Sequence, residues 1–408
     1  MKKKSILLVI PNLGKGGAQQ VFRDQLEFYS KHFNTIGCVF NWDDTFEDDR
    51  QSNIISLDVP AGKSGFDKIV SFWKRVAALK KIKQEHNIDF SISHLEGADY
   101  VNVLSRLNDK IICWIHGTKA YDENIQGILG TLRKKVLIPA AYRRADKVIA
   151  VSEGIGAELN EVFNIPSSKI KTIYNSFVLD DIFTKATQSV SRDIQELFST
   201  RSVLITHCRL SRQKNLFALV DIYITLKKES NSRLMILGDG ELRDALLNYC
   251  KANNLTVYSV WDATQSFNLN YDVYFLGYER NPYPYLHRAS LYLMTSSWEG
   301  FPLALCEAMA CEVPVVAADC YTGPREIISP GLASNQPITS PVFSPCGILM
   351  PLAEKENLSQ WTSTIIAVMN NAEQRRQLTS KGKERVLAFD RKNIQLKWLN
   401  LINQYHEH

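Results

Sequence analysis

Several features that define other classes of protein are missing from this chain of 408 residues. No stretch approaches the roughly 18 consecutive apolar residues that a bilayer-crossing helix needs, so we expect a soluble protein or one on a membrane surface. The eight cysteines are scattered with no CxxC pair, and several lie in apolar runs, where a thiol packs as a small hydrophobe. This pattern suits a reducing cytosol. We expect a cytoplasmic protein, or a peripheral one on the inner face of the cytoplasmic membrane.

Patterns for three kinds of ligand are also missing. The glycine loop "PNLGKGGAQQ" (residues 11–20) lacks the GxGxxG spacing, and no acid ends the second strand as a dinucleotide ribose would require, which argues against a dehydrogenase. His116 has no second His, Cys or acid nearby at ligand spacing, so we expect no metal site. Neither a basic stripe along the whole chain nor a known binding module points to nucleic acid.

The composition is that of ordinary globular protein, with 45% hydrophobic and 22% charged residues. Because single cores stop growing near roughly 250–300 residues, we expect two domains. The opening stretch "MKKKSILLVIPNLGKGG" imitates the basic start of a secretory signal, but its apolar run is short and no small-residue cleavage site follows. We therefore interpret it as a first buried strand.

Short apolar runs alternate with helical periods along both halves of the chain, which is typical of parallel sheets covered on both faces. The expected strands are "SILLVIP", "NTIGCVF", "IDFSISH", "KIICWIHG", "KVIAVS" and "KIKTIYNS", then "SVLITHC", "RLMILGDG", "DVYFLGY", "LYLMTSS", "VPVVAAD" and "GILMP". A polar stretch at 177–196 interrupts the rhythm. We predict an α/β protein with two doubly wound domains, residues 1–185 and 195–385, and a terminal helix at about 386–408.

Ligands of open α/β sheets bind at the carboxyl ends of the strands, so we expect the functional residues at those ends. Gly14, Gly16 and Gly17 precede a helix whose N–H groups and positive dipole end favour an anion, although a bare glycine turn would look the same. His116 follows a strand, and a core or surface histidine is the simpler interpretation. Arg209 and Lys214 follow the expected strand "SVLIT" (residues 202–206) and could neutralise a diphosphate, although exposed basic loops are common.

Two acids stand eight positions apart in "SWEGFPLALCEAMACEVPVV" (residues 297–316). Glu299 lies in a loop, and Pro302 fits the first turn of a helix that carries Glu307 on an otherwise apolar segment. A buried carboxylate is costly unless it accepts hydrogen bonds, and sugar or ribose hydroxyls would supply them. A partly exposed helix acid is the alternative.

Taken in order, "GGAQQ", "HG", "VSEGI", "YNSF", "RLSRQKN", "GDGELRDAL", "FLGY", "EGFPLALCEAMACEVPVVAAD" and "GPREII" resemble the family 4 glycosyltransferases, the retaining nucleotide-sugar transferases of GT-B fold. The resemblance spans almost the whole chain and is most specific over residues 203–328. It implies two Rossmann-like domains facing a central cleft, an N-terminal one for the acceptor and a C-terminal one for the donor, with the terminal helix crossing back to the first. Helical spacing at Ile394, Leu396, Trp398 and Leu401 fits that helix.

The resemblance also implies roles for single residues. Arg209 and Lys214 would hold the donor diphosphate, Glu307 would accept from the ribose, and Glu299 and His116 would lie by the transferred sugar. Further donor-binding positions would be Gly16, Gly17, Gly238, Gly277, Tyr278, Gly300, Phe301, Pro302, Leu303 and, as above, Glu307. We doubt that Glu299 is a nucleophile, since its expected place is beside the sugar rather than below the anomeric carbon.

The expected activity is therefore a metal-independent, retaining hexosyl transfer, with no cofactor, from a nucleotide sugar to a glycan or lipid-linked glycan in cell-surface polysaccharide assembly. Family prevalence favours a uridine diphosphate donor, a UDP-hexose or UDP-N-acetylhexosamine. A sugar-nucleotide epimerase of the same fold and a nonenzymatic nucleotide-sugar-binding partner subunit stay as alternatives. The partner subunit would be expected to have lost Arg209, Lys214 or Glu307, and all three are present.

The sequence departs from the family pattern in its arginine motif and in two insertions, and one basic segment has two possible interpretations. The arginine motif reads "CRL" and "QKN" where glycine usually precedes the arginine and follows the lysine. Inserted residues around 256–270 and 329–346 could shape ligand access or be decoration. The basic segment at 67–86 sets Phe72, Trp73, Val76 and Leu79 among lysines. It could lie on an anionic membrane, or it could simply cover a sheet.

Overall fold

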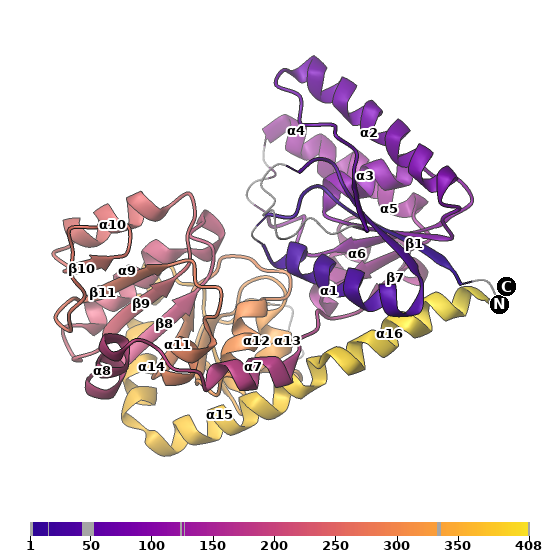
Figure 1. Cartoon of the computed structure of the whole chain (residues 1–408). Coiled ribbons are helices and arrows are strands. Elements are labelled where there is room, and N and C mark those ends of the chain that lie inside the picture. The colour runs from indigo at the N-terminus through magenta and orange to yellow at the C-terminus, as the bar shows by residue number, and fades with distance from the viewer. Residues whose placement is uncertain are drawn as a thin grey trace. The chain divides into compact units, whose positions relative to one another are not determined.

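The computed structural model describes residues 3–14, 16–42, 53–122, 125, 127–332 and 336–406. Lys15 of the glycine loop and residues 333–335 of the second insertion lie outside the described residues. The chain forms two compact units, Met1–Asn175 with Ile394–His408, and Ser176–Asn393 (Figure 1).

The first unit is built on a parallel sheet in the order β3-β2-β1-β4-β5-β6-β7. Its central strands β1 and β4 are buried on both faces, as the continuous apolar runs predict. The strands are β1 (Ser5–Ile10), β2 (Asn34–Val39), β3 (Ile54–Ser56), β4 (Phe90–His94), β5 (Lys110–Ile115), β6 (Lys147–Ala150) and β7 (Ile170–Thr172).

Helices cover both faces of this sheet. Right-handed crossovers place α1 on one face and the helices that follow β3, β4 and β5 on the other, where α2 packs on α3 and α3 on α5 (Figure 1). The helices are α1 (Gly17–His32), α2 (Gly65–Glu85), α3 (Glu96–Leu104), α4 (Gly127–Leu132), α5 (Ile138–Arg144) and α6 (Glu153–Glu161), with a π-helical turn at Arg133–Leu137 between α4 and α5.

The C-terminal helix α16 (Arg391–Asn403) returns to the first unit, as predicted. Its Trp398 is buried and packs on Trp114 and Tyr29, with ring centroids 4.5 and 6.4 Å apart. Ile394 and Leu401 are buried as their spacing suggested, whereas Leu396 is exposed because it lies on the opposite side of the helix.

The second unit holds a sheet in the order β10-β11-β9-β8-β12-β13-β15-β14, parallel except for the last pair. Every strand expected from the sequence is present. The strands are β8 (Val203–His207), β9 (Arg233–Leu237), β10 (Val257–Ser259), β11 (Val273–Gly277), β12 (Leu291–Met294), β13 (Val315–Ala318), β14 (Val342–Ser344) and β15 (Gly347–Met350).

The boundary between the units differs from the predicted one. Residues 176–185, which the sequence placed in the first domain, belong to the second unit, because α7 packs on α11 and α12. The polar stretch is helical rather than a linker, and its apolar side is buried. The helices are α7 (Leu179–Ala186), α8 (Arg192–Thr200), α9 (Leu216–Leu226), α10 (Arg243–Ala252), α11 (Tyr283–Arg288), α12 (Leu303–Ala310), α13 (Pro324–Ile328), α14 (Leu358–Asn370) and α15 (Ala372–Val386).

The connections leave two neighbouring strands in opposite directions between β1 and β4 in the first unit and between β8 and β12 in the second. Loops diverge at such a switch point, which leaves room for a ligand outside the carboxyl ends of the two strands. The loop after β8 carries Arg209 and Lys214, and the loop after β12 carries Glu299. Three of the predicted site residues therefore lie at the switch point of the second sheet.

Candidate functional site

Lys214 and Glu299 form an ion pair at this switch point. The Nζ atom of Lys214 lies 2.6 Å from Oε1 of Glu299, and the two side chains are only 19% and 7% exposed. Gln213 donates to the backbone oxygen of Trp298 at 2.7 Å and to Oε2 of Glu299 at 3.3 Å. Burial by itself would lower the pKa of Lys214, but the Glu299 carboxylate raises it above its ordinary value. The ammonium group therefore stays charged.

Backbone contacts between the two loops fix this pair. The hydroxyl of Thr295 donates to the carbonyl of Lys214 at 3.0 Å, and the amide of Ser297 donates to the carbonyl of Gln213 at 2.9 Å. Asn215 ends the turn in the left-handed conformation, which asparagine tolerates, with φ of 49°. The chain after β12 thus holds the chain after β8 in place.

The Glu299 loop is supported from a third side. The hydroxyl of Thr322 donates to the carbonyl of Glu299 at 2.6 Å. Gly323 has φ of +89°, and a Cβ atom there would lie 2.6 Å from Cδ of Pro302 and 2.9 Å from the oxygen of Gly300. Only glycine permits this approach. Gly300, Phe301 and Pro302 are buried in the loop, and the amides of the first turn of α12, beginning at Leu303, point toward it.

Glu307, on α12, has a separate set of partners. Its Oε2 lies 2.8 Å from Nε2 of His207, and its Oε1 accepts from the hydroxyl of Tyr283 at 3.3 Å. The carboxylate is 20% exposed and His207 is 14% exposed. Two protein side chains thus supply hydrogen bonds to a carboxylate for which sugar or ribose hydroxyls were the donors expected from the sequence. The carboxylate is also partly exposed, as the alternative interpretation held.

Gly238 and Gly277 meet where β9 and β11 end. The amide of Gly238 donates to the carbonyl of Gly277 at 2.6 Å. Gly238 has φ of +133°, and a Cβ atom there would lie 1.8 Å from the oxygen of Cys208. Tyr278, next along the chain, is 53% exposed. In this part of the site the backbone of Gly238 packs directly on the backbone of Cys208, and the exposed ring of Tyr278 follows Gly277.

Arg209 is placed differently from Lys214. Its guanidinium is 67% exposed and pairs with Glu241, its Nε lying 3.1 Å from Oε2 of that residue. An exposed pair of this kind is worth little to stability, so it can open when an anion arrives. The structure leaves Arg209 at the rim of the site and Lys214 within it.

The remaining predicted residues belong to the first unit. His116 follows β5, and its Nε2 lies 3.0 Å from Nδ1 of His94. Burial lowers the pKa of His116 to about 3, and burial together with the neighbouring ring lowers that of His94 further below its ordinary range. Both rings are therefore neutral near pH 7. Gly16 precedes α1, which begins at Gly17.

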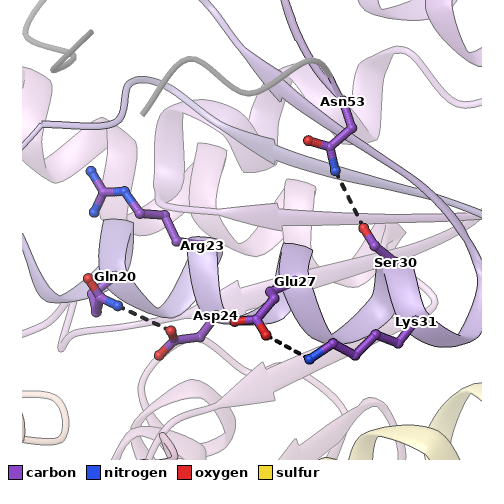
Figure 2. Close-up of a pocket in the computed structure, with 7 residues that line it drawn as sticks. All are labelled: Gln20, Arg23, Asp24, Glu27, Ser30, Lys31 and Asn53. Atoms are coloured by element: carbon purple, nitrogen blue, oxygen red, sulfur yellow. Dashed lines mark hydrogen bonds and ion pairs between the residues drawn. The ribbon is translucent and has the colours of Figure 1, made fainter. Parts of the chain in front are cut away.

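A separate hollow of about 520 Å³ lies along the outer side of α1. Its polar side chains pair with one another, Gln20 with Asp24, Lys31 with Glu27 and Asn53 with Ser30 (Figure 2). None of the predicted site residues lines it.

Within the described residues, no group of three or more His, Cys, Asp and Glu side chains is arranged to hold a metal ion. No helix in the same part of the chain has the length and apolar character that crossing a bilayer requires.

Sequence reasoning missed several residues that contact the predicted ones, and three of them, Gln213, His207 and Tyr283, surround the two glutamates. Gln213 stands directly before Lys214, and its side chain holds the Glu299 loop. His207 is the last residue of β8. Because ligands bind at the carboxyl ends of strands, this position could have been predicted from the sequence. Tyr283 comes from α11, and no local pattern links it to Glu307, because 24 residues separate them.

The two insertions add sheet edges. The first contributes β10, and a cluster of aromatic rings packs the loop that follows it. The rings are those of Tyr258, Phe267, Tyr271 and Tyr274. The second contributes β14, where the hydroxyl of Ser344 donates to the carbonyl of Ile328 at 2.6 Å. Trp261, from the first insertion, reaches the site: a Cβ atom on Gly277 would lie 3.6 Å from its indole.

Comparison with known structures shows that the fold is GT-B. The chain is similar over 99% of its length to all of Anabaena HepE in complex with UDP (18% identity, TM-score 0.74). It is also similar over 99% of its length to all of the sucrose-phosphate synthase of Thermosynechococcus elongatus (17% identity, TM-score 0.77).

Sequence comparison gives the family. Residues 188–385 match the model "Glycosyl transferases group 1", and residues 15–181 match "Glycosyltransferase Family 4". The chain thus belongs to the family 4 glycosyltransferases of GT-B fold.

Two relatives have similar sequences over most of their length. One is the N-acetylgalactosamine-N,N'-diacetylbacillosaminyl-diphospho-undecaprenol 4-alpha-N-acetylgalactosaminyltransferase of Campylobacter jejuni, 25% identical over 95% of this chain and 96% of that protein. The other is an uncharacterized glycosyltransferase of Methanocaldococcus jannaschii, 27% identical over 81% of this chain and 82% of that protein.

Proposed function

We propose that this glycosyltransferase moves a hexose or N-acetylhexosamine from a uridine diphosphate sugar to a lipid-linked glycan during cell-surface polysaccharide assembly. The observation that carries the proposal is the buried Lys214–Glu299 pair at the switch point of the second sheet, next to the start of α12. It sets a fixed positive charge and the amides of a helix start where a sugar diphosphate would dock. A UDP complex of the structural neighbour HepE supports the choice of nucleotide.

The chemistry follows from the charges. Cleavage of the bond between the anomeric carbon and the diphosphate oxygen leaves negative charge on the diphosphate. Lys214 and the amides of the first turn of α12 are fixed before the reaction and would stabilise that charge, with Arg209 joining from the rim. Because protein groups supply the positive charge, the proposed reaction needs no metal ion.

We infer that the anomeric configuration is retained. The name of the Campylobacter relative specifies an alpha linkage, which retention would produce from an α-linked donor. Retaining hydrolases use a carboxylate nucleophile about 5 Å from a second carboxyl group. Glu299 is instead held by Lys214 and Gln213, so it would bind sugar hydroxyls. The acceptor hydroxyl would attack from the face that the diphosphate leaves, and its proton would pass to the departing diphosphate oxygen.

The acceptor class rests on the relatives. The name of the Campylobacter relative describes a diphospho-undecaprenol substrate, a sugar on a lipid diphosphate. A second Campylobacter protein, 22% identical over 97% of this chain and 98% of its own, has a name describing another PP-undecaprenol glycan. His116, Gly16 and Gly17 keep their predicted roles in this proposal, beside the transferred sugar and the phosphates.

A lipid-linked acceptor fits one surface of the first unit, the exposed face of α2. Phe66, Ile69 and Trp73 are spaced as one helical stripe, and 75%, 59% and 56% of their surfaces are exposed. Exposed apolar residues that gather in this way mark an interaction site. Lys68 and Lys74 flank the stripe, so an anionic membrane would satisfy both its charge and its apolar character.

The structure changes which α2 residues take part. Val76 and Leu79 are buried in the core, and Phe72 packs partly against it, so these residues cover the sheet. The first half of the helix carries the exposed stripe. The membrane contact is therefore proposed for the exposed stripe alone.

A donor panel tests the proposed function. The purified protein is incubated with UDP-, GDP- and ADP-linked sugars, with and without undecaprenyl diphosphate glycans, and products are identified by mass spectrometry. We expect release of UDP and a mass gain of one hexose or N-acetylhexosamine on the acceptor. An isomerised nucleotide sugar without transfer would show an epimerase instead, and binding of the nucleotide sugar without turnover would show a nonenzymatic subunit.

A further inference from the structure

Both oxygens of the Glu307 carboxylate contact protein side chains. His207 contacts Oε2 at 2.8 Å and Tyr283 contacts Oε1 at 3.3 Å, and these partners come from different elements, the end of β8 and the start of α11. Each carboxylate oxygen can accept two hydrogen bonds, so each still has room for one from a ligand. The carboxylate is held in position without being fully occupied.

The contacts of His207 suit it to this purpose. A carboxylate only accepts hydrogen bonds, so Nε2 of His207 is the donor. Nδ1 is buried and has no hydrogen-bond partner among the described residues, so the Glu307 contact through Nε2 is the one that orients the ring. The ring packs edge-on against Tyr292 of β12, with centroids 5.9 Å apart. The imidazole is thereby fixed between the two strands of the switch point.

The contacts of Tyr283 hold the carboxylate from the other side. α11 packs on α12 and on α7, and Tyr283 at its start is half-buried. Burial, and then the charge of Glu307, raise the pKa of Tyr283 far above its ordinary value. The phenol therefore stays protonated near pH 7 and can donate to the carboxylate.

We propose that His207 and Tyr283 are positioning residues, which hold the Glu307 carboxylate where it accepts hydrogen bonds from the ribose hydroxyls of the donor. This inference rests on the proposed function together with the role that the family resemblance implies for Glu307, which is to accept hydrogen bonds from the ribose of the donor. It goes beyond it by assigning two residues that do not themselves touch the nucleotide. Without them the carboxylate would populate several rotamers. Part of the free energy of each ribose hydrogen bond would then be lost in restricting the side chain to one rotamer.

Nucleotide selectivity separates positioning from a general structural role. Dissociation constants for UDP and 2′-deoxy-UDP are measured by calorimetry for the wild-type enzyme and for His207→Phe, His207→Gln, Tyr283→Phe and Glu307→Gln. The wild type should bind UDP about tenfold more tightly, because a hydrogen bond to a charged group is at stake. His207→Phe and Glu307→Gln should reduce that ratio to about twofold or less, with 2′-deoxy-UDP binding little changed. Tyr283→Phe should reduce it in part.

His207→Gln is the matched control, since its amide can donate to Glu307 and should keep most of the selectivity. Thermal unfolding of each variant shows that it is folded. An unchanged ratio in His207→Phe, or equal weakening of both nucleotides, would overturn the positioning role. A wild-type enzyme that transfers sugar but does not prefer ribose would overturn the role of Glu307 and the positioning together, while sugar transfer itself would stand.

Discussion

The ammonium group of Lys214 and the carboxylate of Glu299 lie 2.6 Å apart, on loops that follow two neighbouring strands of one sheet. Each charge is largely withdrawn from water, and the attraction between the two offsets the free-energy cost of burying them. The pair therefore links stability and proposed activity, because removing either partner leaves the other buried without a counter-charge.

The first prediction separates these two effects. Lys214→Met leaves the Glu299 carboxylate unpaired, so it should destabilise the second unit by about 3–5 kcal/mol and lower kcat/KM for the donor by about 100-fold or more. The double variant Lys214→Met/Glu299→Gln should recover much of the stability and none of the activity. Unfolding curves and UDP release measure the two quantities. Recovered activity in the double variant would show that Lys214 is needed only to balance Glu299.

The second prediction concerns pH and the His94–His116 pair. The pKa of His116 is about 3 in the folded protein, against about 6.5 when unfolded, so the unfolded chain binds more protons between these values. The contribution of this residue to stability is complete above pH 6.5 and is lost as pH falls toward 3. His94, whose pKa is also lowered, acts in the same direction.

His116→Gln should therefore lose less stability on acidification than the wild type. Hydrogen exchange in β5, the strand that His116 follows, reads the first unit separately from the second. Its protection at pH 7.5 and pH 5.0 should fall less in the variant. An equal fall in both proteins would mean that His116 is protonated in the folded state.

The third prediction tests backbone packing at Gly238. Gly238→Ala puts a Cβ atom 1.8 Å from the oxygen of Cys208 at a φ of +133°. The strained φ alone typically lowers the free energy of unfolding by about 1–3 kcal/mol, and the clash should lower it by about 1 kcal/mol or more in addition. The control is Gly65→Ala, at the start of α2, where nothing lies within 4 Å of the added methyl group. It should leave the melting temperature unchanged or raise it slightly. Equal melting temperatures for the two variants would contradict the described packing.

The fourth prediction concerns the exposed face of α2. Replacing Phe66, Ile69 and Trp73 together by serine should abolish flotation with vesicles containing phosphatidylglycerol at low salt. The fold and UDP release from the free donor should be unaffected, since these side chains are mostly exposed. Val76→Ser is the matched control, because its side chain is buried, so it should lower the melting temperature without removing flotation. Flotation of the triple variant, or none by the wild type, would exclude this face as a membrane contact.

The sequence predicted the central strands of both sheets and one edge strand, β7, but it missed the other three edge strands. A strand with neighbours on both sides is buried and appears as an apolar run, as in β8 and β12. The three strands that were missed, β3, β10 and β14, have three residues each and lie at sheet edges, where one neighbour suffices and the composition is mixed. The polar stretch before β8 was predicted as a domain boundary, and its helices were not identified. Helices α7 and α8 each bury only one narrow side, so most of their residues are polar and the apolar pattern is weak.

The candidate site was predictable wherever strand ends and local motifs determine it. Lys214 and Glu299 were both named, but their direct pairing follows from which strands are neighbours, and the sequence does not give strand order. His207 and Tyr283 were missed because each reaches Glu307 through the packing of separate elements. Contacts of this kind are tertiary, and no spacing along the chain encodes them.

Release of UDP from UDP-sugars, followed by mass spectrometry in the wild type and in Arg209→Ala, Lys214→Ala and Glu307→Ala, tests the proposed function most directly. We predict UDP release and sugar transfer by the wild type, and a loss of about 100-fold or more in kcat/KM in each variant. Near-normal turnover in all three variants would contradict the proposed site. Absence of turnover with every nucleotide sugar and lipid-linked acceptor tried would contradict the proposed donor and acceptor classes.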